Sequence, residues 1–147
     1  MRISPLMAIP LAGVIAGTID IGAACLINLL SPVVILHAIA SGVLGKASFH
    51  GGMHSAALGL VLQWGMSILI ASIYIVPAQA IGALRRHWLA LGLAYGVGIF
   101  IVMNFVVVPL SNAGFKAPHV TPKSALDMLA MLLFGVIVSR FARATEA

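Results

Sequence analysis

Long apolar runs recur along the chain and decide what it can fold into. The first run, residues 6–30, contains a single charged side chain, Asp20. An α-helix needs about 20 mostly apolar residues to cross the hydrocarbon core of a bilayer. Three further runs of this kind lie at residues 56–78, 89–110 and 124–139. We therefore expect an all-α polytopic membrane protein, a four-helix bundle forming one transmembrane domain over residues 1–147.

The composition supports a membrane location. Hydrophobic residues make up 62% of the 147 residues and charged residues only 7%, whereas a soluble domain typically carries about 25% charged residues. The chain therefore has too few charges to cover a water-facing surface. The net charge of +5 comes from basic residues at the ends of apolar runs, a placement typical of membrane topology. The expected partner is the lipid bilayer, and nucleic acid is not expected.

The segment at residues 33–49 differs from the four spans. It is apolar, but it is shorter than a span, carries Lys46 and is interrupted by glycines. We expect an interfacial or partly re-entrant helix here, after the first span.

Four spans place both termini on one side of the membrane. The basic residues then divide into Arg2, Arg85, Arg86, Arg140 and Arg143 on the side of the termini, and Lys46, Lys116 and Lys123 on the other. Because basic residues are enriched in cytoplasmic loops, both termini are expected in the cytoplasm.

Two Gly-x-x-x-Gly pairs lie within the expected spans, Gly13–Gly17 and Gly92–Gly96. Such pairs allow another helix to approach closely. Residues three and four apart share a helical face, so Asp20 lies on the same face as Gly13 and Gly17. A carboxylate near the bilayer centre is costly, so it is expected to face protein or water.

Three strongly polar side chains are predicted at similar depths. At 1.5 Å per residue, Asp20, Gln63 and Asn104 all fall within a few ångströms of one layer. Such an intramembrane polar cluster offers acceptors, amide donors and one titratable proton. It could hold a water or a weakly bound cation, or it could simply fasten three helices together. Asp127, in contrast, resembles the last residue of a capping box begun by Ser124.

The histidines allow a metal-site hypothesis. His50 and His54 are four residues apart, as in metal-binding pairs on a helix. Gly51 and Gly52 lie between them, however, and no carboxylate is near in sequence. All five histidines are expected in loops or near interfaces, so no metal or other cofactor is expected.

Motifs of nucleophilic catalysis and of nucleotide binding are missing from the sequence. It contains no Gly-x-Ser-x-Gly, Walker or Rossmann pattern. The sequence therefore favours a protein that is not an enzyme.

Several strings resemble a known family over nearly the whole chain. They are GTIDI at 17–21, IASGVLG at 39–45, GG at 51–52, AALGL at 56–60 and MNFVVVPLS at 103–111. The chain is similar in these strings to a family of small four-span proteins of the bacterial inner membrane, for which no activity is known. The resemblance implies a bacterial inner-membrane location and leaves the mechanism open. It also draws attention to Asp20 and Asn104, which lie within these strings.

Three functions are compatible with these patterns. The first is an accessory, scaffold or assembly subunit that associates through its Gly-x-x-x-Gly faces, as a homo-oligomer or with a partner membrane protein. The second is an oligomeric transporter or channel for a small solute or ion that uses Asp20. The third is a membrane protein that binds a metal or haem through histidines.

Overall fold

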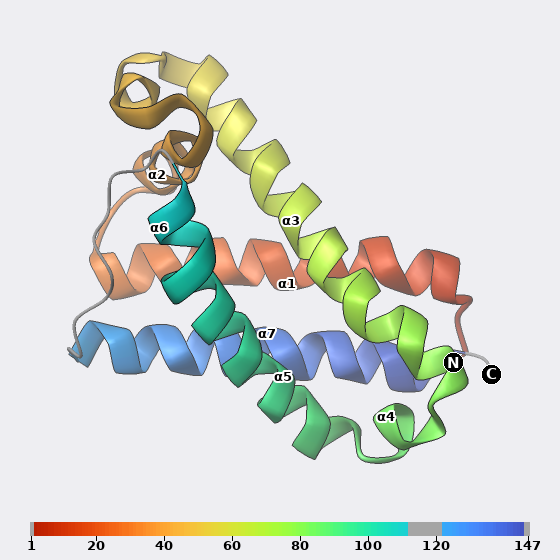
Figure 1. The fold of residues 1–147 in the computed structure, drawn as a ribbon. Coiled ribbons are helices and arrows are strands. Elements are labelled where there is room, and N and C mark those ends of the chain that lie inside the picture. Colours follow the sequence, from red (N-terminus) through yellow and green to blue (C-terminus); the bar gives the residue numbers. More distant parts are fainter. Residues whose placement is uncertain (1, 112–121, 146–147) are drawn as a thin grey trace.

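The computed structural model describes residues 2–111 and 122–145 and is all-helical in these ranges, which confirms the all-α prediction (Figure 1). The elements are α1 (Pro5–Asn28), α2 (Pro32–Leu44), the 3₁₀ segment η1 (Gly45–His50), α3 (Gly52–Ala80), α4 (Gly82–Arg86), α5 (Trp88–Val102), the π-helical segment η2 (Met103–Val107), α6 (Val108–Leu110) and α7 (Pro122–Ala144). Lys116 lies outside the described residues.

Five helical stretches among the described residues are long and apolar enough to cross a membrane. They are Pro5–Asn28, Pro32–His50, Gly52–Ala80, Trp88–Leu110 and Pro122–Ala144. Three of them contain the expected spans at 56–78, 89–110 and 124–139, and Pro5–Asn28 covers the expected first span except for its last two residues. The fifth contains the segment at 33–49. The largest difference in bounds is at α7, which has 23 residues and extends beyond 124–139 at both ends.

The connection between α1 and α2 follows from local chemistry. Helix α1 stops at Leu29, whose φ of 53° is left-handed, a conformation common at helix C-termini. Ser31 then caps α2, because its Oγ accepts a hydrogen bond from the backbone N–H of Val34 at 3.4 Å. Pro32 occupies the first turn of α2, where its missing N–H removes no helical hydrogen bond.

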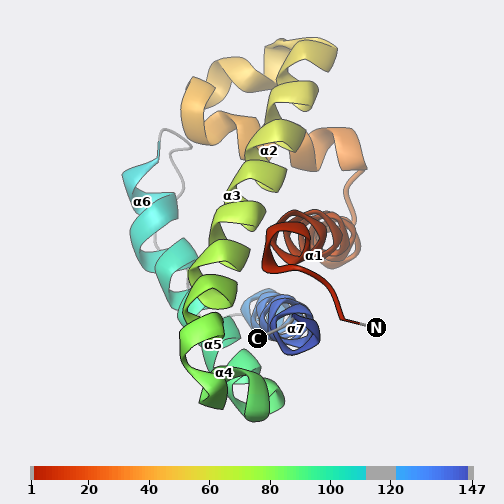
Figure 2. The ribbon, with the colours of Figure 1, turned by 90° about the vertical axis from the view of Figure 1, so that its right-hand side faces the viewer.

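The long helices form two crossed layers. Helices α1 and α7 lie side by side and run in opposite directions, and Figure 2 shows both of them nearly end-on. Helix α3 crosses α1 obliquely, and α5 packs mainly against α7. Helix α2 packs against the N-terminal part of α3, away from α7.

Both Gly-x-x-x-Gly pairs make contacts inside this one chain. A Cβ atom on Gly13 would lie 2.6 Å from Cα of Ile68 on α3, and Gly17 lies against the same helix. The faces of Gly92 and Gly96 are covered by α7 in the same way. The predicted association between chains through these faces does not agree with this packing, because α3 and α7 already occupy both of them.

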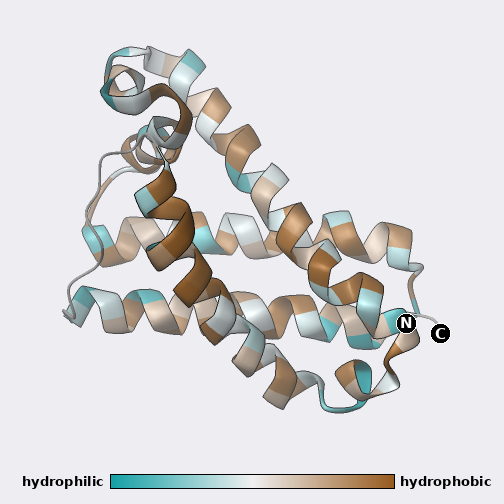
Figure 3. Ribbon diagram, in the orientation of Figure 1, coloured by the Kyte–Doolittle hydropathy of each residue, from teal (hydrophilic) through white to brown (hydrophobic). Residues whose placement is uncertain are grey.

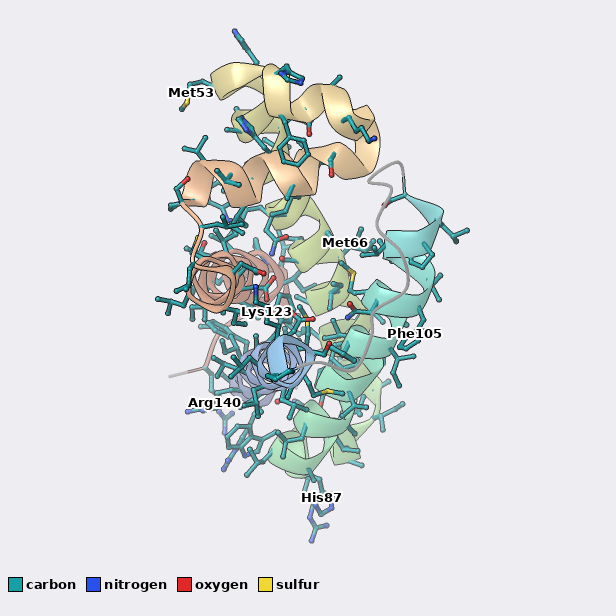
Figure 4. All side chains as sticks on the ribbon, turned by 90° about the vertical axis from the view of Figure 1, so that its left-hand side faces the viewer. Met53, Met66, His87, Phe105, Lys123 and Arg140 are labelled. Atoms are coloured by element: carbon teal, nitrogen blue, oxygen red, sulfur yellow. The ribbon has the colours of Figure 1, made fainter. Side chains whose placement is uncertain are left out.

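Small side chains make up much of the interior, together with a few large ones such as Ile75 and Phe134, while many large apolar side chains lie on the exterior. The fully buried core contains Ala8, Ala12, Ala16, Ala71, Ala78 and Ala142. Large apolar side chains point outward, as Figure 4 shows for Phe105, and the hydrophobic ribbon is nearly continuous along η2 and the adjoining end of α5 (Figure 3). This distribution suits lipid surroundings, where close backbone packing and not burial of large side chains holds helices together.

The two chain ends meet. The backbone N–H of Ile3 donates to the carbonyl of Ala144 at 3.0 Å, and Ile3 forms an isolated parallel bridge with Thr145. The Thr145 side chain also exchanges hydrogen bonds with Gln79 at the end of α3. The N-terminus, the end of α3 and the end of α7 are therefore tied together at one end of the molecule.

Candidate functional site

The first polar contact inside the helical core joins α1 to α3. Gln63 donates from Nε2 to Oδ2 of Asp20 at 2.9 Å and to the carbonyl of Gly17 at 3.4 Å. Trp64, the next residue, donates from its indole N–H to Oγ1 of Thr18 at 3.1 Å. The close approach at Gly17 brings the α3 side chains within reach of Asp20.

The second polar contact joins η2 to α7. Asn104 donates from Nδ2 to the carbonyl of Phe100 at 3.0 Å and to Oδ2 of Asp127 at 3.5 Å. The structure thus brings Asp20 and Gln63 together and pairs Asn104 with an acidic residue on another helix.

Asn104 lies in a π-helical turn that Pro109 helps to explain. Pro109 has no N–H, and its ring clashes with the carbonyl four residues earlier, that of Phe105. A widened turn over Met103–Val107 accommodates such a break in the ladder, and π-turns often occur at functional sites. The result is that the Asn104 side chain is presented to α7.

The sequence pattern of Ser124 and Asp127 predicts a capping box, and this prediction is wrong. Helix α7 already begins at Pro122, so Ser124 lies inside the helix and not before it. Asp127 is in the second turn and accepts from Asn104. The sequence did contain a signal for the longer helix, since the expected span at 124–139 is short for a membrane crossing. A helix that begins earlier, at Pro122, places Asp127 in its second turn.

The two acidic residues of the described chain, Asp20 on α1 and Asp127 on α7, both lie inside long apolar helices. Within the described part of the chain, neither carboxyl group forms an ion pair with a basic side chain. Their polar partners there are the amides of Gln63 and Asn104.

A small pocket lies beside Asp20 and Gln63, where α1, α3, α5, η2 and α7 meet. Its volume is about 20 Å³, which is enough for one water molecule. Apart from the two polar residues, the lining is mainly apolar and includes Met66, Met103 and Met131; Figure 4 shows Met66 on the side of α3 that faces the end of α5. Methionine side chains adapt their shape readily, so the pocket can adjust to an occupant.

A tyrosine pair gives a further polar link that sequence analysis missed. Tyr95 on α5 donates its hydroxyl to the carbonyl of Ile70 on α3 at 2.6 Å. Tyr74 donates to the carbonyl of Leu84 at 3.0 Å, and the two tyrosine rings are 5.0 Å apart. The Tyr95 bond fixes α5 against α3 next to the pocket, and the Tyr74 bond ties α4 to the end of α3.

The histidine pair does not share a helical face. His50 ends η1, whereas His54 lies in α3, and Gly52 between them has a φ of +60°. Among the described residues, no three His, Cys, Asp or Glu side chains are grouped to hold a metal ion. His37 is instead hydrogen-bonded from Nε2 to the carbonyl of Gly52 at 2.8 Å, so it ties α2 to the start of α3.

Comparison with known proteins gives no match to a family model, to a curated protein or to a solved structure. The resemblance to the four-span inner-membrane family stays a prediction.

Proposed function

We propose that the chain is a multi-pass protein with four membrane spans, α1, α3, α5 with η2 and α6, and α7. The hydrogen-bonded chain ends support this topology. Two ends that touch lie on the same side of a membrane, so the number of crossings is even. Of the five candidate stretches, one therefore does not cross.

The stretch that stays at the surface is α2 with η1. Helix α2 has 13 residues and is about 20 Å long, whereas the hydrocarbon core is about 30 Å thick. Gly45, with a φ of +64°, separates α2 from η1. Lys46 and His50 in η1 are exposed, which suits the membrane–water interface. This location agrees with an interfacial helix after the first span.

The distribution of arginine favours cytoplasmic termini. The ends of α4 and α7 carry four arginines near the chain termini, namely Arg85, Arg86, Arg140 and Arg143. Lys123 lies at the opposite end of α7, and Lys46 lies in η1, away from the termini (Figure 1). The positive-inside rule then places the termini in the cytoplasm. We propose the bacterial inner membrane as the location.

Within this topology we propose that the layer formed by Asp20, Gln63, Asn104 and Asp127 binds a proton or a small monovalent cation. The observation that carries the proposal is the Asp20 carboxyl inside an apolar helix, where it accepts a hydrogen bond from Gln63, lines a water-sized pocket and forms no ion pair with a basic side chain of the described residues. One ionised carboxylate near the bilayer centre costs about 2.5–3.5 kcal/mol on insertion scales. A second carboxylate within the same set of helices, Asp127, adds to this cost, because like charges repel. A shared proton or cation removes both penalties, and the side-chain oxygens supply hard ligands.

The function that follows is a transporter or channel for a small ion that uses Asp20 as the ion-binding group. A pocket of about 20 Å³ holds an ion or one water but gives no path through the chain. Ion movement therefore requires a second conformation or the contacts of an oligomer, and the methionine side chains that line the pocket can adapt to such a change.

Ion flux in proteoliposomes tests this proposal. We expect purified wild-type protein to carry H⁺ or Na⁺ down an imposed gradient, and Asp20→Asn to abolish the flux because the amide cannot release a proton or neutralise a cation. Ser72→Ala is the control on α3, since Ser72 is half-buried and its hydroxyl donates to its own helix, at the Leu69 carbonyl. Wild-type vesicles that are no more permeable than empty vesicles would refute transport.

An accessory or assembly subunit is the second candidate function. The outward apolar side chains of η2 and α6, including Phe105, Val106 and Leu110, form a face that a partner membrane protein could cover. Native mass spectrometry after gentle extraction tests this candidate: a stable complex with a different protein supports it, whereas a bare monomer or homo-oligomer contradicts it.

A further inference from the structure

Two arginines of α7 gather on one tryptophan at the end of the molecule that carries the chain termini. The guanidinium carbons of Arg140 and Arg143 lie 5.9 Å and 5.7 Å from the centre of the Trp88 ring. Both distances are within the range of cation–π attraction. Trp88 is the first residue of α5, while both arginines are exposed. The ring therefore orders two guanidinium groups that still face the surroundings.

The neighbouring helix α4 adds two more arginines. Arg85 donates from Nη1 to the carbonyl of Thr145 at 3.5 Å, and its buried Nε has no hydrogen-bond partner within the described residues. Arg86, the next residue, is exposed. Four positive charges thus lie at one end of the molecule, and side-chain contacts hold three of them, those of Arg85, Arg140 and Arg143.

Negative charge at this end does not come from the described part of the chain. Its two acidic residues, Asp20 and Asp127, belong to the polar layer within the helices. Glu146 lies outside the described residues, so the experiment below tests the effect of its charge with a separate variant. A tryptophan at the start of a span is typical of the membrane–water interface, where lipid headgroups supply phosphate anions.

We propose that Arg85, Arg86, Trp88, Arg140 and Arg143, here called the arginine–tryptophan surface, bind the phosphate-bearing headgroup of an anionic phospholipid. Guanidinium groups match phosphate oxygens with paired N–H donors. A lipid supplies this anion at the depth of Trp88, and its acyl chains meet the exposed apolar side chains of α5, such as Leu89 and Leu93. The proposal depends on the membrane location but not on ion binding by the carboxyl layer.

Lipid retention in native mass spectrometry tests the proposal with the full-length protein. Delipidated protein is titrated with phosphatidylglycerol, with phosphatidylcholine and with inorganic phosphate. We expect phosphatidylglycerol to bind in preference to phosphatidylcholine. Removing each arginine charge should weaken its binding about five-fold, so Arg140→Gln with Arg143→Gln should weaken it about 25-fold.

Matched variants separate this surface from general charge effects. Lys46→Gln removes one exposed charge at the opposite end and should bind as the wild type does, while lysine at positions 140 and 143 should restore most of the affinity. Glu146→Gln should not weaken binding, because it removes a negative charge.

Three results would overturn the proposal. The first is that phosphatidylglycerol and phosphatidylcholine bind equally well. The second is that the Arg140→Gln, Arg143→Gln double variant binds phosphatidylglycerol as well as Lys46→Gln does. The third is that millimolar inorganic phosphate displaces the lipid, which would indicate a site for the free anion. If lipid binding fails these tests while ion flux is intact, only the lipid proposal is refuted, because the lipid site and the ion site share no residue.

Discussion

Gly96→Ala tests whether close backbone contact between α5 and α7 holds the fold together. A Cβ atom at Gly96 would lie 2.6 Å from the carbonyl oxygen of Met131 and 2.7 Å from Cα of Leu132. Both are backbone atoms, so no side chain can rotate away. An ordinary contact needs about 3.5 Å, so the two helices must separate by roughly 0.8 Å at this point.

The neighbouring glycine Gly98 provides a matched control. It lies in the same helix, and an added Cβ there would meet nothing within 4 Å. Replacing glycine by alanine favours a helix by up to about 1 kcal/mol in water, and this gain applies to both variants. Overpacking typically costs about 1–3 kcal/mol. Gly96→Ala should therefore be less stable than Gly98→Ala by about that amount.

Equilibrium unfolding measures this difference. The two variants and the wild type are unfolded by increasing sodium dodecyl sulfate in mild detergent micelles and followed by far-ultraviolet circular dichroism. We expect the Gly96→Ala midpoint to be lowest and the Gly98→Ala midpoint to be at or above that of the wild type. Equal midpoints for the two variants would refute the close α5–α7 contact.

Three further predictions concern α1, the polar layer and the topology. Gly13→Ala should destabilise the protein in the same assay while Gly22→Ala does not, because only Gly13 contacts backbone atoms of α3, and equal effects would contradict the α1–α3 packing. Gln63→Leu removes the amide that bonds Asp20 and should lower stability by about 1–3 kcal/mol; an unchanged midpoint would show that the bond contributes nothing. Reporter fusions at the two chain ends should both report the cytoplasm, and an insertion after Lys46 should report the opposite side; termini on opposite sides would contradict the four-span topology.

The long helices could be predicted because their signal is local. A run of apolar residues long enough to cross a bilayer has few alternatives to a helix, since every backbone group must be satisfied within the segment. The sequence alone therefore indicates α1, α3, α5 and α7. It also indicates the weakness of the segment at 33–49, because its length and its glycines are visible without coordinates.

The partners of the polar residues could be predicted only in part. Depth along a span follows from counting residues, and it selected Asp20, Gln63 and Asn104. Which helices are neighbours, and how they cross, depends on packing of side chains far apart in sequence. The same limitation affected the glycine pairs, whose closeness of approach was predictable but whose partners, α3 and α7 of the same chain, were not.

Asp127 was missed because two local patterns compete at the start of α7. Ser124 and Asp127 fit a capping box if the helix begins after Ser124, and they lie inside the helix if it begins at Pro122. A proline in the first turn is itself a frequent helix start. Giving Pro122 this role would have placed both acidic residues, Asp20 and Asp127, inside long apolar helices.

Infrared difference spectroscopy of the protein in membranes tests the shared-carboxyl proposal most directly. The carbonyl stretch of a protonated carboxyl group is recorded while the pH is raised or Na⁺ is added, for the wild type, Asp20→Asn and Asp127→Asn. The account predicts a protonated-carboxyl band in the wild type that decreases with base or cation and is diminished in both variants. A wild-type spectrum with no such band, or one that neither variant alters, would contradict the account.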